Sequence, residues 1–363
     1  MHIAIDAREL VSRPTGVGRY LSRLIDSWDS LPAAQAHRFT LLAHGTIALP
    51  ANSLDVQQVV LPGRGGTAWE QGTLPGALRR LSPDVLFAPG YTAPILCPAP
   101  IALAVHDVSF ASHPEWFPWR EGVRRRLVTR LAARRAAVVL TLSAFSRGEI
   151  VRHLGIEASK VRVIPLGLGL SPDVERPAAA APSGAPHILF VGSLFNRRHV
   201  DALVRAMPSV LRRVPGARLT IVGDNRTWPR IDPAGLADEL GITTHVTVTT
   251  FVDDARLRAL YAEATTFAFL SEYEGFGLTP LEALAAGVAP VVLDTPVARE
   301  VYGAAATYVA APDAGLVADA LTAVLTEPEH RARVLEAAPA VLAQYRWADA
   351  APATLRAIED AAR

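Results

Sequence analysis

The 363-residue chain is poor in the side chains that build covalent frameworks and redox sites. Cys97 is its single cysteine and Lys160 its single lysine, so nearly all of its positive charge is arginine. One cysteine excludes an internal disulfide, a CxxC redox site and a cysteine-rich zinc site, and it is typical of a reducing compartment. We therefore expect a cytoplasmic protein.

Long apolar runs and a strong net charge are also missing from the sequence. The start, MHIAIDAREL, has no basic segment followed by a long apolar run, and no stretch approaches the roughly 20 apolar residues that span a bilayer. The formal charge is +1, so no overall field attracts nucleic acid. We expect no signal peptide, no membrane span and no nucleic-acid partner.

The chain does have enough apolar residues, 50% of its length, to fill two cores. Short β-branched runs alternate with helical patterns throughout, which is typical of βαβ units and parallel sheets. The fold class that we predict is α/β. The predicted strands are His2–Asp6, Arg38–Ala43, Asp84–Ala88, Ile101–His106, Ala137–Leu142 and Val161–Ile164 in the first half, and His187–Gly192, Ala217–Gly223, His245–Phe251, Thr265–Leu270 and Ala289–Leu293 in the second.

A segment rich in Pro, Ala, Gly and Ser separates these two halves. It runs over 166–186 and has no apolar periodicity, so we predict an interdomain linker there. In Rossmann-like halves, ligands bind at the carboxyl ends of the strands, and two facing halves would place that crevice between the domains. Residues that directly follow strands are therefore the candidates for chemistry.

The stretch SEYEGFGLTPLEALAAG, Ser271–Gly287, joins a strand end to a helix through glycines. Gly275 and Gly277 let the backbone approach a ligand closely, and the free amides at the helix start favour a phosphate. Glu274 in the loop and Glu282 in the helix can accept hydrogen bonds from hydroxyls. Two glutamates alone would more often be surface carboxylates, but the whole string favours a diphosphate ligand with hydroxyls at both ends.

The same string resembles the E-x7-E motif of the retaining family 4 glycosyltransferases, read as Glu274-GFGLTPL-Glu282 within the context FxSxYEGFGLxPLEAxAxG. The resemblance implies the GT-B fold, with two facing Rossmann-like domains and an interdomain cleft. It implies an acceptor-binding domain over 1–165, a nucleotide-sugar-binding domain over 187–345, and a final helix over 346–363 that crosses back near Trp347. The donor-binding residues that it implies in this motif are Glu274, Gly275, Phe276, Gly277, Leu278, Thr279 and Glu282.

The N-terminal PTGVGRY resembles the family's glycine loop. Its Gly16 and Gly18 would approach the donor diphosphate from the first domain. A nicotinamide-binding Rossmann loop is disfavoured, because Leu21 stands where a third glycine is required.

Two further segments of the first half match the family. VHDVSF resembles its HD motif, in which His106 reaches toward the transferred sugar with Asp107 beside it; the alternative is a structural histidine at a strand end. TLSAFSRGEI resembles its SxxSxxE segment, which would place Ser143 in the sugar or acceptor region. The alternative is that Ser143 and Ser146 cap a helix.

VGSLFNRRHVDAL opens the second half and places two arginines after its first strand. By resemblance, Gly192, Arg197 and Arg198 contact the leaving diphosphate, whose charge the guanidiniums would neutralise. The family pattern is Arg then Lys, so Arg198 is a departure that changes shape and reach. IVGDNRTW and TFVDDARL resemble segments of the nucleobase pocket, which adds Asp224 and Val252 to the donor-binding residues.

The resemblance predicts a hexosyltransferase that retains anomeric configuration, with His106, Arg197, Arg198 and Glu274 as its catalytic residues. No metal and no cofactor are expected, because arginines and helix amides replace the cation. Adjacent aspartates at 253 and 254 fit a helix cap rather than a DxD metal motif.

The donor that we favour is GDP-mannose, from a general likeness to bacterial mannosyltransferases of the family. The acceptor is expected to be a glycan or lipid-linked glycan, as in polysaccharide or lipopolysaccharide biosynthesis. The alternatives are an inactive sugar-nucleotide-binding or scaffold protein of the same fold, and a nucleotide-sugar epimerase or a phosphorylase.

One segment outside these motifs is strongly basic. Trp116–Arg135 carries seven arginines, and Val123, Leu127 and Leu131 form an apolar stripe within it. Such a helix suits a peripheral position on anionic lipid at the inner face of the cytoplasmic membrane. The alternative is a helix that docks this stripe on the sheet and leaves its arginines in solvent.

Overall fold

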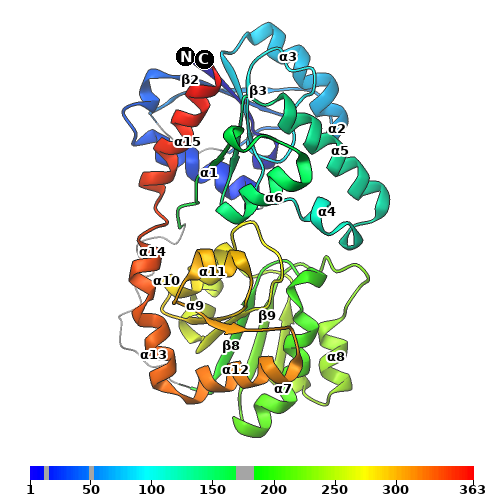
Figure 1. The fold of residues 1–363 in the computed structure, drawn as a ribbon, viewed down its shortest axis with the longest axis vertical. Helices are drawn as coiled ribbons and strands as arrows, with labels where there is room; N and C mark the ends of the chain where they lie inside the picture. The colour runs from blue at the N-terminus through cyan, green and yellow to red at the C-terminus, as the bar shows by residue number, and fades with distance from the viewer. Residues whose placement is uncertain (12–15, 49–52, 169–183) are drawn as a thin grey trace. The chain divides into compact units, whose positions relative to one another are not determined.

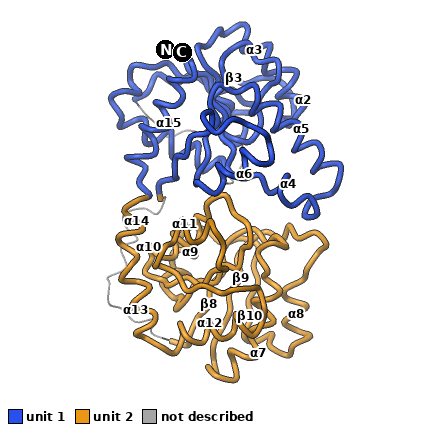
Figure 2. The backbone as a smooth tube through the Cα atoms, in the orientation of Figure 1, with its two compact units in different colours: residues 1–167, 345–363 blue, residues 168–344 orange. Residues whose placement is uncertain are grey.

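The computed structural model describes residues 1–11, 16–48, 53–168 and 184–363. These residues form two compact units (Figure 2): unit 1 contains Met1–Gly167 and Tyr345–Arg363, and unit 2 contains Leu168–Gln344. Each unit has one sheet in which the described strand pairs are parallel, ordered β3-β2-β1-β4-β5-β6-β7 in unit 1 and β10-β9-β8-β11-β12-β13 in unit 2. The predicted α/β class with two Rossmann-like domains is confirmed.

Unit 1 follows the predicted strand pattern with one addition. Its strands are β1 (His2–Asp6), β2 (Arg38–Ala43), β3 (Asp55–Val60), β4 (Val85–Ala88), β5 (Ile101–Ala104), β6 (Val138–Thr141) and β7 (Val161–Val163). Its α-helices are α1 (Gly16–Asp29), α2 (Gly66–Ala68), α3 (Leu74–Leu81), α4 (Ser109–Ser112), α5 (Trp119–Arg135), α6 (Ala144–Leu154) and α15 (Trp347–Ala361). The sequence did not predict β3, because this edge strand has no buried residue and so lacks an apolar run.

Unit 2 repeats the arrangement. Its strands are β8 (His187–Val191), β9 (Arg218–Val222), β10 (Val246–Thr249), β11 (Thr266–Phe269), β12 (Ala289–Leu293) and β13 (Thr307–Val309). Its α-helices are α7 (Val200–Arg213), α8 (Pro233–Glu239), α9 (Asp254–Glu263), α10 (Leu278–Ala285), α11 (Pro296–Tyr302), α12 (Ala314–Thr326), α13 (Pro328–Glu336) and α14 (Ala338–Leu342). The three-residue edge strand β13 was not predicted either.

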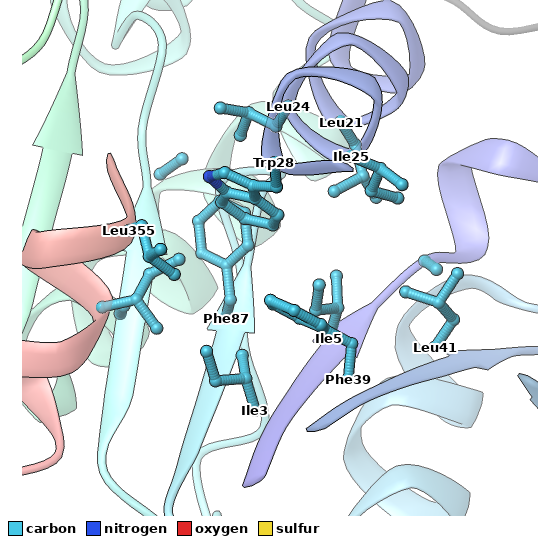
Figure 3. Close-up of a cluster of buried hydrophobic side chains, with 14 of the residues drawn as sticks. Ile3, Ile5, Leu21, Leu24, Ile25, Trp28, Phe39, Leu41, Phe87 and Leu355 are labelled. Atoms are coloured by element: carbon cyan, nitrogen blue, oxygen red, sulfur yellow. The ribbon is translucent and has the colours of Figure 1, made fainter. Parts of the chain in front are cut away.

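The core of unit 1 joins the two ends of the chain. Trp28 of α1 is fully buried, stacks on Phe39 with ring centroids 5.5 Å apart, and packs among aliphatic side chains of the sheet (Figure 3). Its Nε1 donates to the carbonyl of Ala351 in α15 at 3.0 Å, so the last helix lies beside the first (Figure 1). Truncating such an aromatic side chain typically costs about 3–5 kcal/mol.

The chain leaves unit 1 and returns to it at neighbouring points. A Cβ on Gly167 would lie 2.3 Å from the backbone nitrogen of Trp347, so only glycine permits this contact. Most of the predicted linker, 169–183, lies outside the described residues, as do Pro14 and Thr15 of the predicted glycine loop.

Candidate functional site

In unit 2, the loop between β11 and α10 ends at Gly277, where close packing leaves no room for a side chain. Gly277, the residue before α10, has φ +87°, and a Cβ there would lie 2.1 Å from the Tyr302 hydroxyl. That hydroxyl donates to the Gly277 carbonyl at 2.8 Å. The first turn of α10 contains no acidic residue, and the Thr279 hydroxyl is buried without a hydrogen-bond partner among the described residues. The start of this helix can therefore donate hydrogen bonds to an anion.

Glu274 of the same loop joins it to the arginine pair. Its Oε1 accepts from Arg198 Nε at 2.8 Å and from the Ser271 hydroxyl at 2.9 Å, and it lies 3.8 Å from Arg197 Nη2. The carboxylate is 15% exposed. Burial alone would raise the pKa of Glu274, but the two guanidiniums and the hydrogen bonds from Arg198 and Ser271 outweigh it and hold the pKa below its ordinary value. Glu274 is therefore ionised at neutral pH.

The arginine pair follows β8 in a 3-10 turn, Asn196–Arg198, and both guanidiniums are anchored. Arg197 Nε donates to the Tyr273 carbonyl at 3.0 Å. Arg198 uses Nε for Glu274 and Nη1 for the Ser193 carbonyl, at 2.8 Å each, and it lies 4.9 Å from the centre of the Phe269 ring. A single lysine ammonium cannot reproduce this two-point contact, which explains why arginine suits this position.

Gly192 makes room for that contact. It has φ +141°, and a Cβ there would lie 2.7 Å from Arg198 Nη1. Two guanidiniums and one carboxylate leave a net positive charge beside the start of α10. This arrangement can bind an anion and stabilise negative charge that develops on it.

Glu282 lies on α10, half-buried, with its Oε2 3.5 Å from the Tyr261 hydroxyl of α9. Val252, between β10 and α9, is also half-buried. Asp224 is mainly exposed and pairs with Arg226 at 2.7 Å. Asp253 accepts from the Arg256 amide at 2.7 Å, so the helix-cap interpretation of the adjacent aspartates is confirmed.

In unit 1, His106 follows β5, which ends two residues earlier than predicted. Its Nε2 lies 2.7 Å from the Pro89 carbonyl, and because a carbonyl only accepts, Nε2 must carry the proton. Burial lowers the pKa of His106, although the Pro89 hydrogen bond and Asp107 oppose that effect. The ring is thus a neutral imidazole near pH 7, and its Nδ1 can accept a hydrogen bond.

The other residues of unit 1 that the sequence predicted for the site differ in exposure and in their hydrogen bonds. Gly16 begins α1 in an exposed position, where a Cβ would meet no atom within 4 Å, and Gly18 is buried. Asp107 Oδ1 accepts from the Ser109 amide at 2.8 Å. Ser143 is buried and accepts from the Ser146 amide at 3.0 Å, so it does cap α6, as the alternative interpretation held.

A buried ionic cluster at the same sheet edge was not predicted from the sequence. Arg8 lies 3.0 Å from Asp6, which ends β1, and it also pairs with Glu70, whose Oε1 accepts from the Thr92 hydroxyl at 2.6 Å. Burial raises the pKa of Asp6 to about 6 against the opposing charge of Arg8. The sequence signal for this cluster was Asp-Ala-Arg at the end of the first buried strand, since polar residues at strand ends were already the candidates for chemistry.

The apolar stripe of the basic segment is not docked on the sheet. On α5, Val123, Leu127 and Leu131 are 46%, 56% and 37% exposed, and Trp119 is 72% exposed. The residues of α5 that are buried are instead Gly122, Thr129, Ala132 and Ala133. The interpretation that buries this stripe is therefore wrong: the helix packs through its small residues and presents its large apolar ones.

The described ranges, which omit 12–15, 49–52 and 169–183, contain neither a candidate metal site nor a candidate membrane span. No three His, Cys, Asp or Glu side chains in them are grouped to hold a metal ion. No helix in them is both long and apolar enough to cross a bilayer.

Glu274→Ala should destabilise unit 2 by about 3–5 kcal/mol at neutral pH, because it leaves a buried guanidinium without its partner. Since the folded-state pKa of Glu274 is depressed, its stabilisation is present above the ordinary glutamate pKa and is lost as the pH falls toward the folded value. Urea unfolding at several pH values measures both effects. Asp319→Ala, at an exposed ion pair with Arg213 in the same unit, is the matched control and should cost about 0–1 kcal/mol; equal losses in the two variants would contradict the assignment.

Comparison with known proteins places the chain among glycosyltransferases. Residues 14–171 match the family model described as Glycosyltransferase Family 4, and residues 173–341 match the one described as Glycosyl transferases group 1. The class predicted from the sequence, a hexosyltransferase, agrees with the class of these models.

Curated relatives carry the same class name. O-antigen chain mannosyltransferase B of Escherichia coli is 30% identical over 59% of this chain and 56% of its own length. D-inositol 3-phosphate glycosyltransferase of Segniliparus rotundus is 28% identical over 60% and 50%. The chain thus spans about half the length of these two relatives. The GDP-mannose-dependent alpha-(1-6)-phosphatidylinositol monomannoside mannosyltransferase of Mycobacterium tuberculosis is 29% identical over 89% and 83%.

Solved structures show the same fold. WaaG, a glycosyltransferase involved in lipopolysaccharide biosynthesis, has a TM-score of 0.75 at 18% identity and covers 99% of both chains. HepE of Anabaena in complex with UDP-glucose has a TM-score of 0.72 at 18% identity, over 99% of this chain and 98% of its own. With family models that together run from residue 14 to residue 341, the chain belongs to the family 4-like glycosyltransferases of the GT-B fold.

Proposed function

We propose that this chain transfers a hexose from a nucleoside-diphosphate sugar to a glycan or lipid-linked glycan. The observation that carries the proposal is the cluster of Arg197, Arg198 and Glu274 beside the start of α10 in unit 2. This positively charged cluster suits a diphosphate, and Glu282 further along α10 offers a carboxylate to hydroxyls. The names of the relatives support the same reaction class.

The donor that we favour is GDP-mannose. Two relatives are named as mannosyltransferases, and the name of one states dependence on GDP-mannose. The residues that would bind the base, around Asp224 and Val252, do not by themselves select guanine.

In the proposed reaction the anomeric configuration is retained. The bond between the anomeric carbon and the phosphate oxygen breaks, and the acceptor oxygen bonds to that carbon from the same face. The acceptor proton passes to the departing phosphate, so no protein nucleophile is needed. Arg197, Arg198 and the α10 amides stabilise the charge on the leaving diphosphate, which is the role that a metal ion has in other enzymes.

A panel of GDP-, UDP-, ADP- and dTDP-sugars should raise the melting temperature selectively, because a ligand that binds only the folded state stabilises it by mass action. We expect the largest shift with GDP-mannose, measured by differential scanning fluorimetry. No shift with any donor would contradict the proposed site. A shift without transfer to any acceptor would favour the inactive binding protein, and conversion of the donor without acceptor would favour an epimerase.

Arg198→Ala should lower kcat about 10²–10³-fold, since it removes a donor that acts on the developing charge. Glu282→Ala should mainly raise the KM for the nucleotide sugar. Initial rates at varied donor concentration separate the two effects, and the wild-type rate should be the same with and without EDTA. Arg205→Ala, on the exposed face of α7, is the control; near-wild-type kinetics in both site variants would refute the assignment.

We further propose that α5 binds an anionic membrane surface, where a lipid-linked acceptor would be available. The support is the combination on one helix of exposed Trp119, Val123, Leu127 and Leu131 with seven arginines in 116–135. Apolar side chains bordered by cations insert at the interface of anionic bilayers.

In a flotation assay, the wild-type chain should float with vesicles containing phosphatidylglycerol at low salt and less at high salt, because salt screens the arginines. Leu127→Glu should abolish flotation. Leu316→Glu, which places the same charge at a 44% exposed leucine on α12, should not. Absence of wild-type flotation at low salt would overturn the proposal.

A further inference from the structure

The turn after β4 contacts His106 and Asp107 through the backbone carbonyl of Pro89 and the side chain of Tyr91. The Pro89 carbonyl accepts from His106 Nε2 at 2.7 Å. The Tyr91 hydroxyl donates to Asp107 Oδ2 at 2.9 Å, and the Tyr91 ring packs edge-on against the His106 ring, with centroids 5.5 Å apart. One short turn therefore sets the position of both members of the HD motif.

Tyr91 makes these contacts from an unfavourable backbone conformation. Its φ is +65°, in the left-handed region that a bulky side chain rarely adopts. The amide of Tyr91 donates to the Ala104 carbonyl of β5 at 2.8 Å, which ties the turn to the neighbouring strand. Ser82, another described non-glycine residue with positive φ, ends α3, where such a conformation is common. Tyr91 ends no helix, so its conformation must be maintained by its surroundings.

The buried ionic cluster supplies part of that support through Thr92. The Thr92 hydroxyl donates to Glu70 Oε1 at 2.6 Å, and Arg8 Nη2 lies 3.4 Å from the same hydroxyl. Glu70 is 1% exposed, so its ion pair with Arg8 and its bond from Thr92 are shielded from water. A buried charged pair holds a fixed geometry better than a solvated one, because releasing either partner is costly.

We propose that Tyr91 is a positioning residue: its ring contact and its hydrogen bond to Asp107 hold His106 where Nε2 donates to the Pro89 carbonyl, and Tyr91 is itself held in place by the Arg8–Glu70 pair through Thr92. Under this arrangement Nδ1 of His106 is the atom available to accept from a sugar hydroxyl. The titratable side chains that face the His106 ring among the described residues are Tyr20 from α1, Tyr91 from the turn, and the adjacent Asp107. The kinetic consequence rests on the proposed function, whereas the state of the imidazole does not.

The direct test is the protonation state of His106 in Tyr91→Phe, which removes the hydroxyl and keeps the ring. Without its donor, the Asp107 charge is less satisfied and attracts a proton to His106 more strongly. Long-range ¹H–¹⁵N spectra of the full chain labelled at histidine, assigned with His106→Gln, report tautomer and titration. We expect the Nε2–H form in the wild type, and in Tyr91→Phe a second tautomer or a His106 pKa that rises toward its ordinary value.

Matched variants separate positioning from general damage. Thr92→Val should shift the His106 signals in the same direction as Tyr91→Phe. Thr92→Ser keeps the hydroxyl, so its His106 signals should match those of the wild type. Tyr308→Phe, at a tyrosine that bonds backbone carbonyls in unit 2, should change nothing. If transfer is observed, Tyr91→Phe should lower kcat about tenfold with little change in KM, as expected for lost orientation.

Unchanged His106 tautomer and pKa in both Tyr91→Phe and Thr92→Val would overturn the proposal. If the wild-type chain transfers no sugar from any donor, the proposed function fails, and the spectra still decide whether Tyr91 positions His106.

Discussion

The ion pair between Glu274 and Arg198 is the interaction on which the unit 2 site depends. It joins the turn after β8 to the loop after β11, two segments 76 residues apart in the chain, through a 2.8 Å hydrogen bond that is mostly shielded from water. The same carboxylate oxygen lies 3.8 Å from Arg197 and accepts from Ser271, so one charged atom organises both guanidiniums and the loop. Because Glu274 neutralises only one of the two cations, the cluster keeps a net positive charge that can bind an anion.

A second constraint is close backbone approach at this sheet edge. A Cβ on Gly223, after β9, would lie 1.9 Å from the carbonyl oxygen of Gly192, and a Cβ on Gly192 would collide with Arg198. Gly277 meets Tyr302 in the same way before α10. These glycines are required by packing within unit 2. Because these residues have no Cβ, the strand ends and loops can pack closely enough to bring the arginines and the helix amides together.

Unit 1 also has a buried ionic cluster at the carboxyl edge of its sheet, but carboxylates outnumber guanidiniums in it. Asp6 and Glu70 surround Arg8, so this cluster has one more carboxylate than guanidinium, and it lies next to the turn that holds a neutral His106. A neutral imidazole and hydroxyl-bearing side chains suit hydroxyl groups better than phosphates. The described residues of the two sites therefore differ in charge: the cluster of unit 2 is net positive, whereas the cluster of unit 1 is net negative and lies next to a neutral histidine.

By itself, the sequence determined the α/β class and nearly all the strands, because buried parallel strands need continuous apolar runs. It also located the glycine loop between Glu274 and Glu282, because glycines directly before a helix start indicate a turn in which the backbone approaches its neighbours closely. It could not reveal the edge strands β3 and β13, which have little buried surface, or the exposure of the α5 stripe, which depends on whether small or large residues face the sheet. Nor could it show that Arg8 pairs with Glu70, or Arg198 with Glu274, since these partners lie 62 and 76 residues apart. Only the tertiary structure decided those pairs. The parallel sheet brings distant strand ends to one edge, and a charge that is buried there is costly unless it pairs with an opposite charge.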